Sequence, residues 1–123
     1  MKHLPIIDIF TIPHNCQDYD TIGNYGDDNG IWWVEISEMG WEYEMACLIH
    51  EISEMALTKK NNINWDKITK FDIESGLDNP GESKKSPYHL QHKQAEKIEK
   101  LFCKEMGISW KKYDSIIDKL KYD

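Results

Sequence analysis

The chain has 123 residues, of which 40% are hydrophobic, and it contains five tryptophans and six tyrosines. This length and composition predict one folded domain over residues 1–123 and exclude a disordered chain. The formal net charge is −7. Such a surplus of acidic groups argues against nucleic-acid binding through neutralised phosphates as the main role.

The cysteines and the apolar segments predict a cytoplasmic protein. The three cysteines form no C-x-x-C pair, which is typical of reduced thiols rather than of a disulfide framework. Asp8 and Pro13 interrupt the only apolar run near the N-terminus, so we expect no signal peptide. No stretch approaches the roughly 20 apolar residues of a membrane span, so we expect no membrane partner.

Two segments in the first third of the chain are predicted to be strands. Leu4–Ile12 is rich in β-branched residues and is stopped by Pro13. Asn15–Gly30 is rich in Asp, Asn and Gly and is predicted to be a long polar loop. Ile31–Ser37 is the second strand, and we expect the two strands to pair as an antiparallel ribbon.

Helical spacing begins at Trp41 and continues to about Lys60. Apolar residues cover well over half of this helix, which predicts a central helix packed on more than one side. Ser86-Pro87 is a typical helix start, with the serine as N-cap, and Gly107 ends that helix. The other expected helices are Trp65–Ser75 and Trp110 to about Lys121. The sequence thus predicts an α+β fold, a short antiparallel ribbon packed on three to four helices.

The segment His50-Glu51-Ile52-Ser53-Glu54 lies inside the first predicted helix. His50 and Glu54 are four residues apart and share one face, whereas Glu51 lies about 100° further round the axis. A zinc hydrolase needs two ligands on one face and a carboxylate beside the metal to take a proton from water. The usual pattern is H-E-x-x-H, so Glu54 replaces the second histidine as the candidate ligand.

A catalytic zinc site needs a third protein ligand, and His92 is the candidate because it lies at the margin of the apolar face of its helix. Glu96 and Glu99, one and two turns further on, are candidates for a fourth ligand or for a supporting partner. Asp72 is a candidate to orient a ligand histidine. Tyr88 and Tyr113 are alternative candidates for a hydrogen-bond donor to the substrate.

The same residues also fit a structural interpretation. Charged stripes usually form the solvated face of a surface helix, and a lone histidine such as His92 is commonly a hydrogen-bonded core residue. Cys47, one turn before His50, fits either a soft metal ligand or a buried structural cysteine. The sequence assigns no role to His3, His14 or His89.

Leu48–Glu54 resembles the active-site helix of zincin-type metallopeptidases, and departs from it at Glu54, where those enzymes have histidine. The resemblance implies a minimal zincin-like domain that binds Zn²⁺ through His50 and Glu54, with Glu51 as general base.

A longer stretch, from about residue 32 to residue 113, resembles a group of short bacteriophage and prophage proteins. These share an H-E-x-x-E helix, a Phe-Asp pair, a Pro-Gly loop, a Pro-Tyr-x-x-x-His helix start and a final Gly-(Ile/Val)-x-Trp-x-x-Tyr. The matching residues here are His50, Glu51, Glu54, Phe71, Asp72, Pro80, Gly81, Pro87, Tyr88, His92, Gly107, Ile108, Trp110 and Tyr113. The resemblance implies that the charged members form one site in a protein acting inside an infected bacterium, and it implies no particular activity.

Three functions remain open from the sequence. The first is a zinc-dependent hydrolase, peptidase- or amidase-like, in which Glu51 takes the proton of a metal-activated water. The second places Mg²⁺ or Mn²⁺ among Glu51, Glu54, Glu96 and Glu99 for work on a nucleotide phosphate, although imidazole ligands suit zinc better. The third is a non-enzymatic phage protein that binds a host protein.

Overall fold

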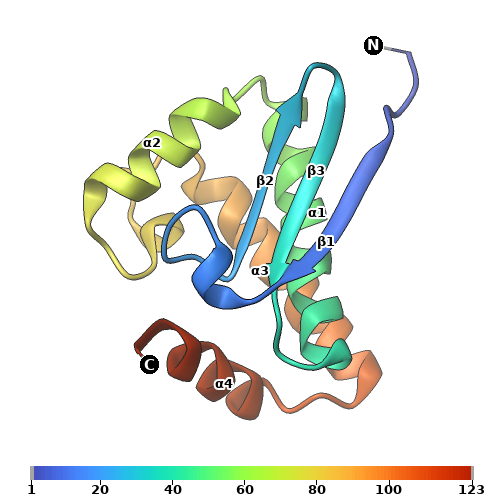
Figure 1. Ribbon diagram of the computed structural model, residues 1–123, viewed down its shortest axis with the longest axis vertical. Helices are drawn as coiled ribbons and strands as arrows, with labels where there is room; N and C mark the ends of the chain where they lie inside the picture. Colours follow the sequence, from blue (N-terminus) through green and yellow to red (C-terminus); the bar gives the residue numbers. More distant parts are fainter. Residues whose placement is uncertain (1, 123) are drawn as a thin grey trace.

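The computed structural model describes residues 2–122, which form an α+β fold of a three-stranded mixed sheet and four α-helices (Figure 1). The predicted fold class is therefore confirmed. The sheet lies on one side of the first helix, α1 (Trp41–Lys60), and α3 (His89–Met106) lies on its other side. The prediction of a central helix is also confirmed.

The predicted antiparallel ribbon is wrong. The strands β1 (Ile7–Ile12) and β3 (Ile31–Ser37) pair in parallel, with Ile7 opposite Trp32. A third strand, β2 (Gly23–Asp28), pairs antiparallel with the other edge of β3, so the strand order is β1-β3-β2. The chain crosses the end of β3 between β1 and β2, and this crossing makes β1 run the same way as β3.

Strand β2 falls inside the segment that was predicted to be a polar loop. Its sequence, Gly-Asn-Tyr-Gly-Asp-Asp, holds only one residue with a strong preference for strands. The missed signal is Asn29-Gly30, the residue pair that most favours a tight β-hairpin. Both residues have positive φ, 52° and 90°, as that turn requires.

The predicted helices are all present, with one shifted start. Helix α2 spans Trp65–Ser75, and α4 spans Trp110–Tyr122. Helix α3 begins at His89 and not at Ser86-Pro87, because the Ser86 hydroxyl caps a turn by accepting from the Tyr88 N–H at 3.2 Å. At its other end Gly107 takes the left-handed conformation that ends the helix, as expected.

Apolar side chains fill most of the space around α1. One cluster lies between the sheet and α1 and the other joins α1 to α3 and α4. The buried members of the first are Tyr25, Trp32, Val34, Ile36, Cys47 and Met55, and those of the second are Ala46, Cys103 and Tyr113. Burial of each large side chain stabilises the fold by about 1.5–3 kcal/mol. Charged residues occupy the remaining part of the α1–α3 interface, where His50, Glu54 and Glu99 are buried.

Within residues 2–122, none of the helices has the length and apolar character needed to cross a membrane.

Candidate metal centre

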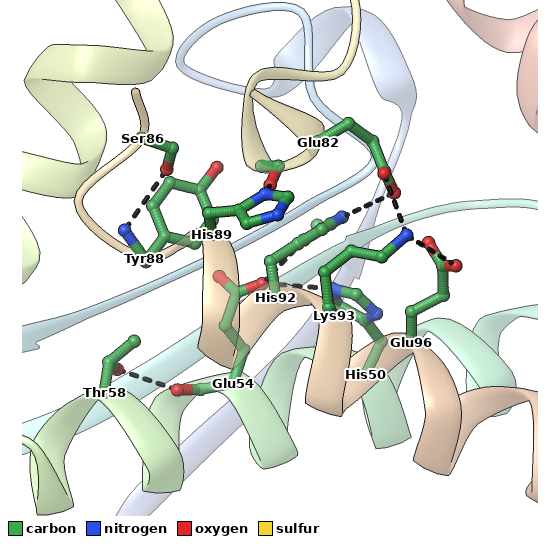
Figure 2. A network of polar contacts seen from close by, with 12 residues as sticks. His50, Glu54, Thr58, Glu82, Ser86, Tyr88, His89, His92, Lys93 and Glu96 are labelled. Atoms are coloured by element: carbon green, nitrogen blue, oxygen red, sulfur yellow. Dashed lines mark hydrogen bonds and ion pairs between the residues drawn. The ribbon is translucent and has the colours of Figure 1, made fainter. Parts of the chain in front are cut away.

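Two neighbouring helices bring His50, Glu54 and His92 together. His50 and Glu54 project from α1, and His92 projects from α3 toward them (Figure 2). The Glu54 Oε2 atom lies 3.1 Å from His50 Nε2 and 3.1 Å from His92 Nδ1. One ligand atom from each of the three residues lies within 4.8 Å of those of the other two. The predicted ligand set therefore converges at one point.

The spacing of these atoms fits a metal ion. Ligand atoms at about 2.0–2.1 Å from a tetrahedral ion stand about 3.3 Å apart, close to the two separations of 3.1 Å around Glu54. His50 Nε2 and His92 Nδ1 both face the same Glu54 oxygen. Two imidazoles and one carboxylate suit zinc and its first-row neighbours better than magnesium or calcium. The donor set fits a transition metal without selecting one.

The second ring nitrogen of His50 is held by Glu99. His50 Nδ1 donates to Glu99 Oε1 at 2.8 Å, and the Tyr113 hydroxyl donates to Glu99 Oε2 at 2.6 Å. Histidines that bind metals usually donate their other N–H to a carboxylate, which fixes the ring and makes it more basic. Burial alone would lower the pKa of His50, but its hydrogen bonds to Glu54 and Glu99 outweigh that effect and raise it. Glu99 is thus the supporting partner, one of the two roles expected of it.

Glu54 has a partner that the sequence did not predict. The Tyr25 hydroxyl, on β2, donates to Glu54 Oε1 at 2.8 Å. Burial would raise the pKa of Glu54, but the hydrogen bonds from His50 and His92 dominate and lower it to about 2. The Glu54 carboxylate is therefore ionised and fixed from three sides. Tyr25 was missed because its strand was taken for a loop.

Glu51 lies beside the cluster and stays free of it. Its side chain rests against the backbone of β2, where a Cβ on Gly23 would come within 2.5 Å of Glu51 Oε1. Among residues 2–122, no hydrogen bond or ion pair reaches this carboxylate, although its residue is only 8% exposed. Burial, and next the charge of Glu54, raise the pKa of Glu51 to about 8. A buried carboxyl with a pKa near neutrality is suited to accept and return a proton.

His92 Nε2 is a buried polar atom without a hydrogen-bond partner among the described residues. It lies 3.4 Å from Glu82 Oε1, an ion-pair distance, but makes no hydrogen bond within the described residues. Glu96, expected as a fourth ligand or a support, instead pairs with Lys93 at 3.4 Å and with Lys100 at 3.3 Å (Lys93 in Figure 2). Glu96 also lies near enough to Glu82 and His92 to form a second group with metal-ligand spacing. Lys93 and Lys100 would compete with a metal ion for the carboxylates of this second group.

Asp72 orients tyrosines and not a histidine, contrary to the expectation from the sequence. Its two carboxylate oxygens accept from the Tyr88 hydroxyl at 2.6 Å and from the Tyr19 hydroxyl at 3.1 Å. The hydroxyl of Tyr88 is therefore already engaged, which argues against its expected role as a donor to the substrate. The Tyr88 ring lies edge-on to the His92 ring, with 6.0 Å between centroids, so Asp72 holds a tyrosine that contacts the centre.

A cavity of about 180 Å³ opens beside the cluster. The predicted site residues His50, Glu51, Glu54, Asp72, Tyr88, His92 and Glu96 all line it. Its other walls come from the segment before β2, from β2, from α2 and from α4. Cys47 also lines it, but this thiol is buried and donates toward Ile22 O at 3.8 Å. The centre is therefore open to a small molecule.

A second histidine cluster lies elsewhere on the sheet. His14 Nδ1 lies 2.9 Å from Ser37 Oγ, and His14 Nε2 lies 2.7 Å from Asp20 Oδ1. This is the connectivity of a serine–histidine–aspartate triad with the two ring nitrogens exchanged. Ser37, however, is 0% exposed, and its hydroxyl also accepts from Gln17 Nε2 at 3.2 Å. A fully buried serine cannot reach a substrate. The cluster therefore has a structural role, since its hydrogen bonds join the β1–β2 connection to β3.

Comparisons of the chain with protein-family models, with curated proteins and with solved structures return no match. The likenesses to zincins and to phage proteins therefore remain expectations from the sequence. The geometry of the described residues alone identifies the His50–Glu54–His92 cluster as a candidate transition-metal centre with Glu51 and Glu99 at its sides.

Proposed function

We propose that this protein is a zinc-dependent hydrolase that cleaves a peptide or a related amide. The single observation that carries the proposal is the convergence of His50, Glu54 and His92 at a cavity, with Glu51 unpaired beside them. Three protein ligands and an accessible side distinguish a catalytic zinc site from a closed structural one.

The chemistry assigns one role to each group. His50, Glu54 and His92 would hold the zinc ion, which would act as a Lewis acid and lower the pKa of a bound water toward 7. Glu51 accepts a proton from the attacking water as its oxygen adds to the carbonyl carbon. Glu51 then returns that proton to the nitrogen that leaves when the C–N bond breaks. Glu99 keeps the His50 ring in place and takes no part in proton transfer.

The electrostatics of Glu51 support this role. Its raised pKa arises from burial and from the negative charge of Glu54. A cation held by Glu54 would offset that charge and lower the pKa of Glu51 toward ionisation. Glu51 would then be a base only when the metal is present, which couples its proton transfer to an occupied site.

The same observations rank the other two candidate functions lower. Magnesium- or manganese-dependent work on phosphates favours oxygen ligands, whereas two imidazoles face the centre of this site. A protein that only binds a host protein has no need of an unpaired buried carboxyl at a cavity.

The three cysteines are all free thiols, which supports a reducing, cytoplasmic setting.

The experiment that tests the proposal compares the zinc-loaded protein with its Glu51→Gln variant on a mixed peptide library, with products read by mass spectrometry. The expected result is cleavage by the wild type, a loss of about 10²–10⁴-fold in the variant and unchanged zinc content. Glu42→Gln, at an exposed position in the first turn of α1, is the matched control and should cleave normally. Loss of zinc from Glu51→Gln would make Glu51 a ligand, and equal cleavage by both proteins would exclude it as the base.

A further inference from the structure

The wall of the cavity beside the candidate metal centre is strongly acidic. Seven acidic side chains line it, against one lysine, Lys121, and two histidines, His50 and His92. The Lys121 ammonium donates to the backbone carbonyl of Asp78. The cavity therefore has a large excess of negative over positive groups, and its low-dielectric walls concentrate their field.

Several of these carboxylates are not neutralised by neighbouring cations. Glu96 pairs with lysines, and Glu54 and Glu99 pair with His50. By contrast, within residues 2–122, no lysine or histidine lies at ion-pair distance from Glu51, Asp72 or Asp114. Asp72 accepts only from tyrosine hydroxyls, and Asp114 lies on the exposed part of α4.

The two positive charges of a bound zinc ion do not reverse this balance. They offset the charges of Glu54 and Glu51, which lie next to it. Asp72 and Asp114, which line the cavity, would then remain as negative groups around the space that a substrate would enter. The field that meets an incoming molecule is thus still negative.

We infer that the substrate carries a positive charge, an ammonium group, close to the bond that is cleaved, and that anionic substrates are rejected. This inference rests on the proposed hydrolase and names its substrate class. An ammonium in the cavity gains attraction from Asp72 and Asp114, whereas a carboxylate or phosphate is repelled. The ammonium can be a lysine-like side chain or a free amino terminus, since both present the same charge.

The size of the cavity limits how much of the substrate it holds. About 180 Å³ is below the roughly 300–1,000 Å³ of most ligand pockets, so the cavity has room for about one amino-acid-sized group and not for a longer peptide. The charged group and the cleaved bond therefore have to lie within about one residue of each other. A charge further along a peptide would lie outside the cavity and be screened by salt.

The test measures binding of three hydroxamates of similar length to the zinc-loaded protein by calorimetry. They are 6-aminohexanohydroxamate, heptanohydroxamate and adipic monohydroxamate, with cationic, neutral and anionic ends. We expect about tenfold tighter binding of the cation than of the neutral compound and about tenfold weaker binding of the anion at low salt, since each step changes one charge at close range. Leucine hydroxamate, compared with its N-acetyl form, tests the free amino terminus as the source of the charge.

Two substitutions in α4 test whether the preference for cationic ligands arises from the cavity. Asp114→Asn should reduce the ratio of cation to anion binding by about two- to threefold, because one exposed charge is removed. Asp118→Asn, an exposed residue one turn further on that does not line the cavity, is the matched control and should leave the ratio unchanged.

The outcomes separate the inference from the proposed function. Equal binding of the three compounds, or tightest binding of the anion, with zinc retained, overturns the charge preference and leaves the hydrolase standing. Failure of the protein to take up zinc overturns both. An unchanged ratio in Asp114→Asn together with a changed ratio in Asp118→Asn would also contradict the inference, because the charge selection would then come from outside the cavity.

Discussion

His14 and His50 each link two side chains through their two ring nitrogens. His14 joins Ser37 to Asp20, and His50 joins Glu54 to Glu99. The two clusters have comparable hydrogen-bond distances, from 2.7 to 3.1 Å. Connectivity alone would therefore mark both of them as catalytic.

Their surroundings differ in two respects. Ser37 is fully buried and engaged on several sides, so the His14 cluster has no reactive group open to a ligand. The His50 cluster shares a cavity with Glu51, a carboxyl that no described residue binds, and with His92, whose Nε2 atom makes no hydrogen bond there. A closed hydrogen-bond network stabilises a fold, whereas one with unused groups facing a cavity can act on a ligand.

The largest expected effect separates the two clusters by metal binding. His50→Ala and His92→Ala each remove one of three ligands, so zinc affinity should fall by more than about 100-fold. His14→Ala, which breaks the other cluster, should bind zinc as the wild type does. Calorimetric titration of the metal-free proteins with zinc measures all three. Unchanged affinity in His92→Ala would contradict the ligand set.

A smaller effect is expected from the groups behind His50. Glu99→Gln removes the carboxylate that holds the His50 ring, and zinc affinity should fall by about 10–100-fold. Tyr113→Phe removes only the hydroxyl that binds Glu99 at 2.6 Å, and its loss should be smaller. Tyr43→Phe is the control, because the Tyr43 ring stacks on Tyr113 without a hydroxyl contact to Glu99. The absorption spectrum of the cobalt-loaded protein should shift in Glu99→Gln and stay unchanged in Tyr43→Phe.

The pH dependence should have opposite signs for folding and for metal binding. Folding raises the pKa of His50 above its usual value of about 6.5 and that of Glu51 to about 8. The folded metal-free protein therefore holds protons that the unfolded chain releases, and its free energy of unfolding should fall as pH rises from about 5 to 8. Zinc displaces the protons on the histidines, so its affinity should rise over the same range.

Two measurements check that stability falls and zinc affinity rises with pH. Urea unfolding of the metal-free protein at pH 5.5 and pH 8.0 gives the stability, and zinc titration at the same pH values gives the affinity. In His50→Ala the decrease in stability with pH should be shallower, because one of the groups with a raised pKa is gone. A metal-free protein that gains stability toward pH 8 would contradict the protonation states assigned to the cluster.

The smallest effect on zinc binding and cleavage is expected from changes at the His14 cluster. Ser37→Ala removes hydrogen bonds that tie the β1–β2 connection to β3, at a cost of about 1–3 kcal/mol in the free energy of unfolding. Peptide cleavage and zinc affinity should not change, because Ser37 is sealed from solvent. A loss of cleavage with zinc retained would show that this serine reaches a substrate, and the distinction between the clusters would fail.

Local sequence patterns were sufficient to predict that His50, Glu54 and His92 would lie close together. The spacing of His50 and Glu54 places them on one helical face, and the position of His92 at the edge of an apolar stripe places it toward the interior. The sheet was harder to predict, because a strand of Gly, Asn and Asp resembles a loop. Its pairing depends on the whole topology, to which the only local clue was Asn29-Gly30.

The partners of the ligands could not be derived from spacing. Tyr25 reaches Glu54 from β2, and Tyr113 reaches Glu99 from α4. Such contacts join segments far apart in sequence and depend on how the elements pack. Asp72 lies near the site, as its position in the sequence indicates, but its partners are tyrosines and not the expected histidine.

The most direct test of the metal centre is zinc X-ray absorption spectroscopy on the zinc-loaded protein. We expect about one zinc per chain, nitrogen and oxygen ligands at about 2.0–2.1 Å, and the multiple-scattering signal of two imidazoles. A sulfur ligand at about 2.3 Å would assign the metal to a cysteine such as Cys47. That result, or zinc bound without imidazole, would contradict the assignment of His50, Glu54 and His92.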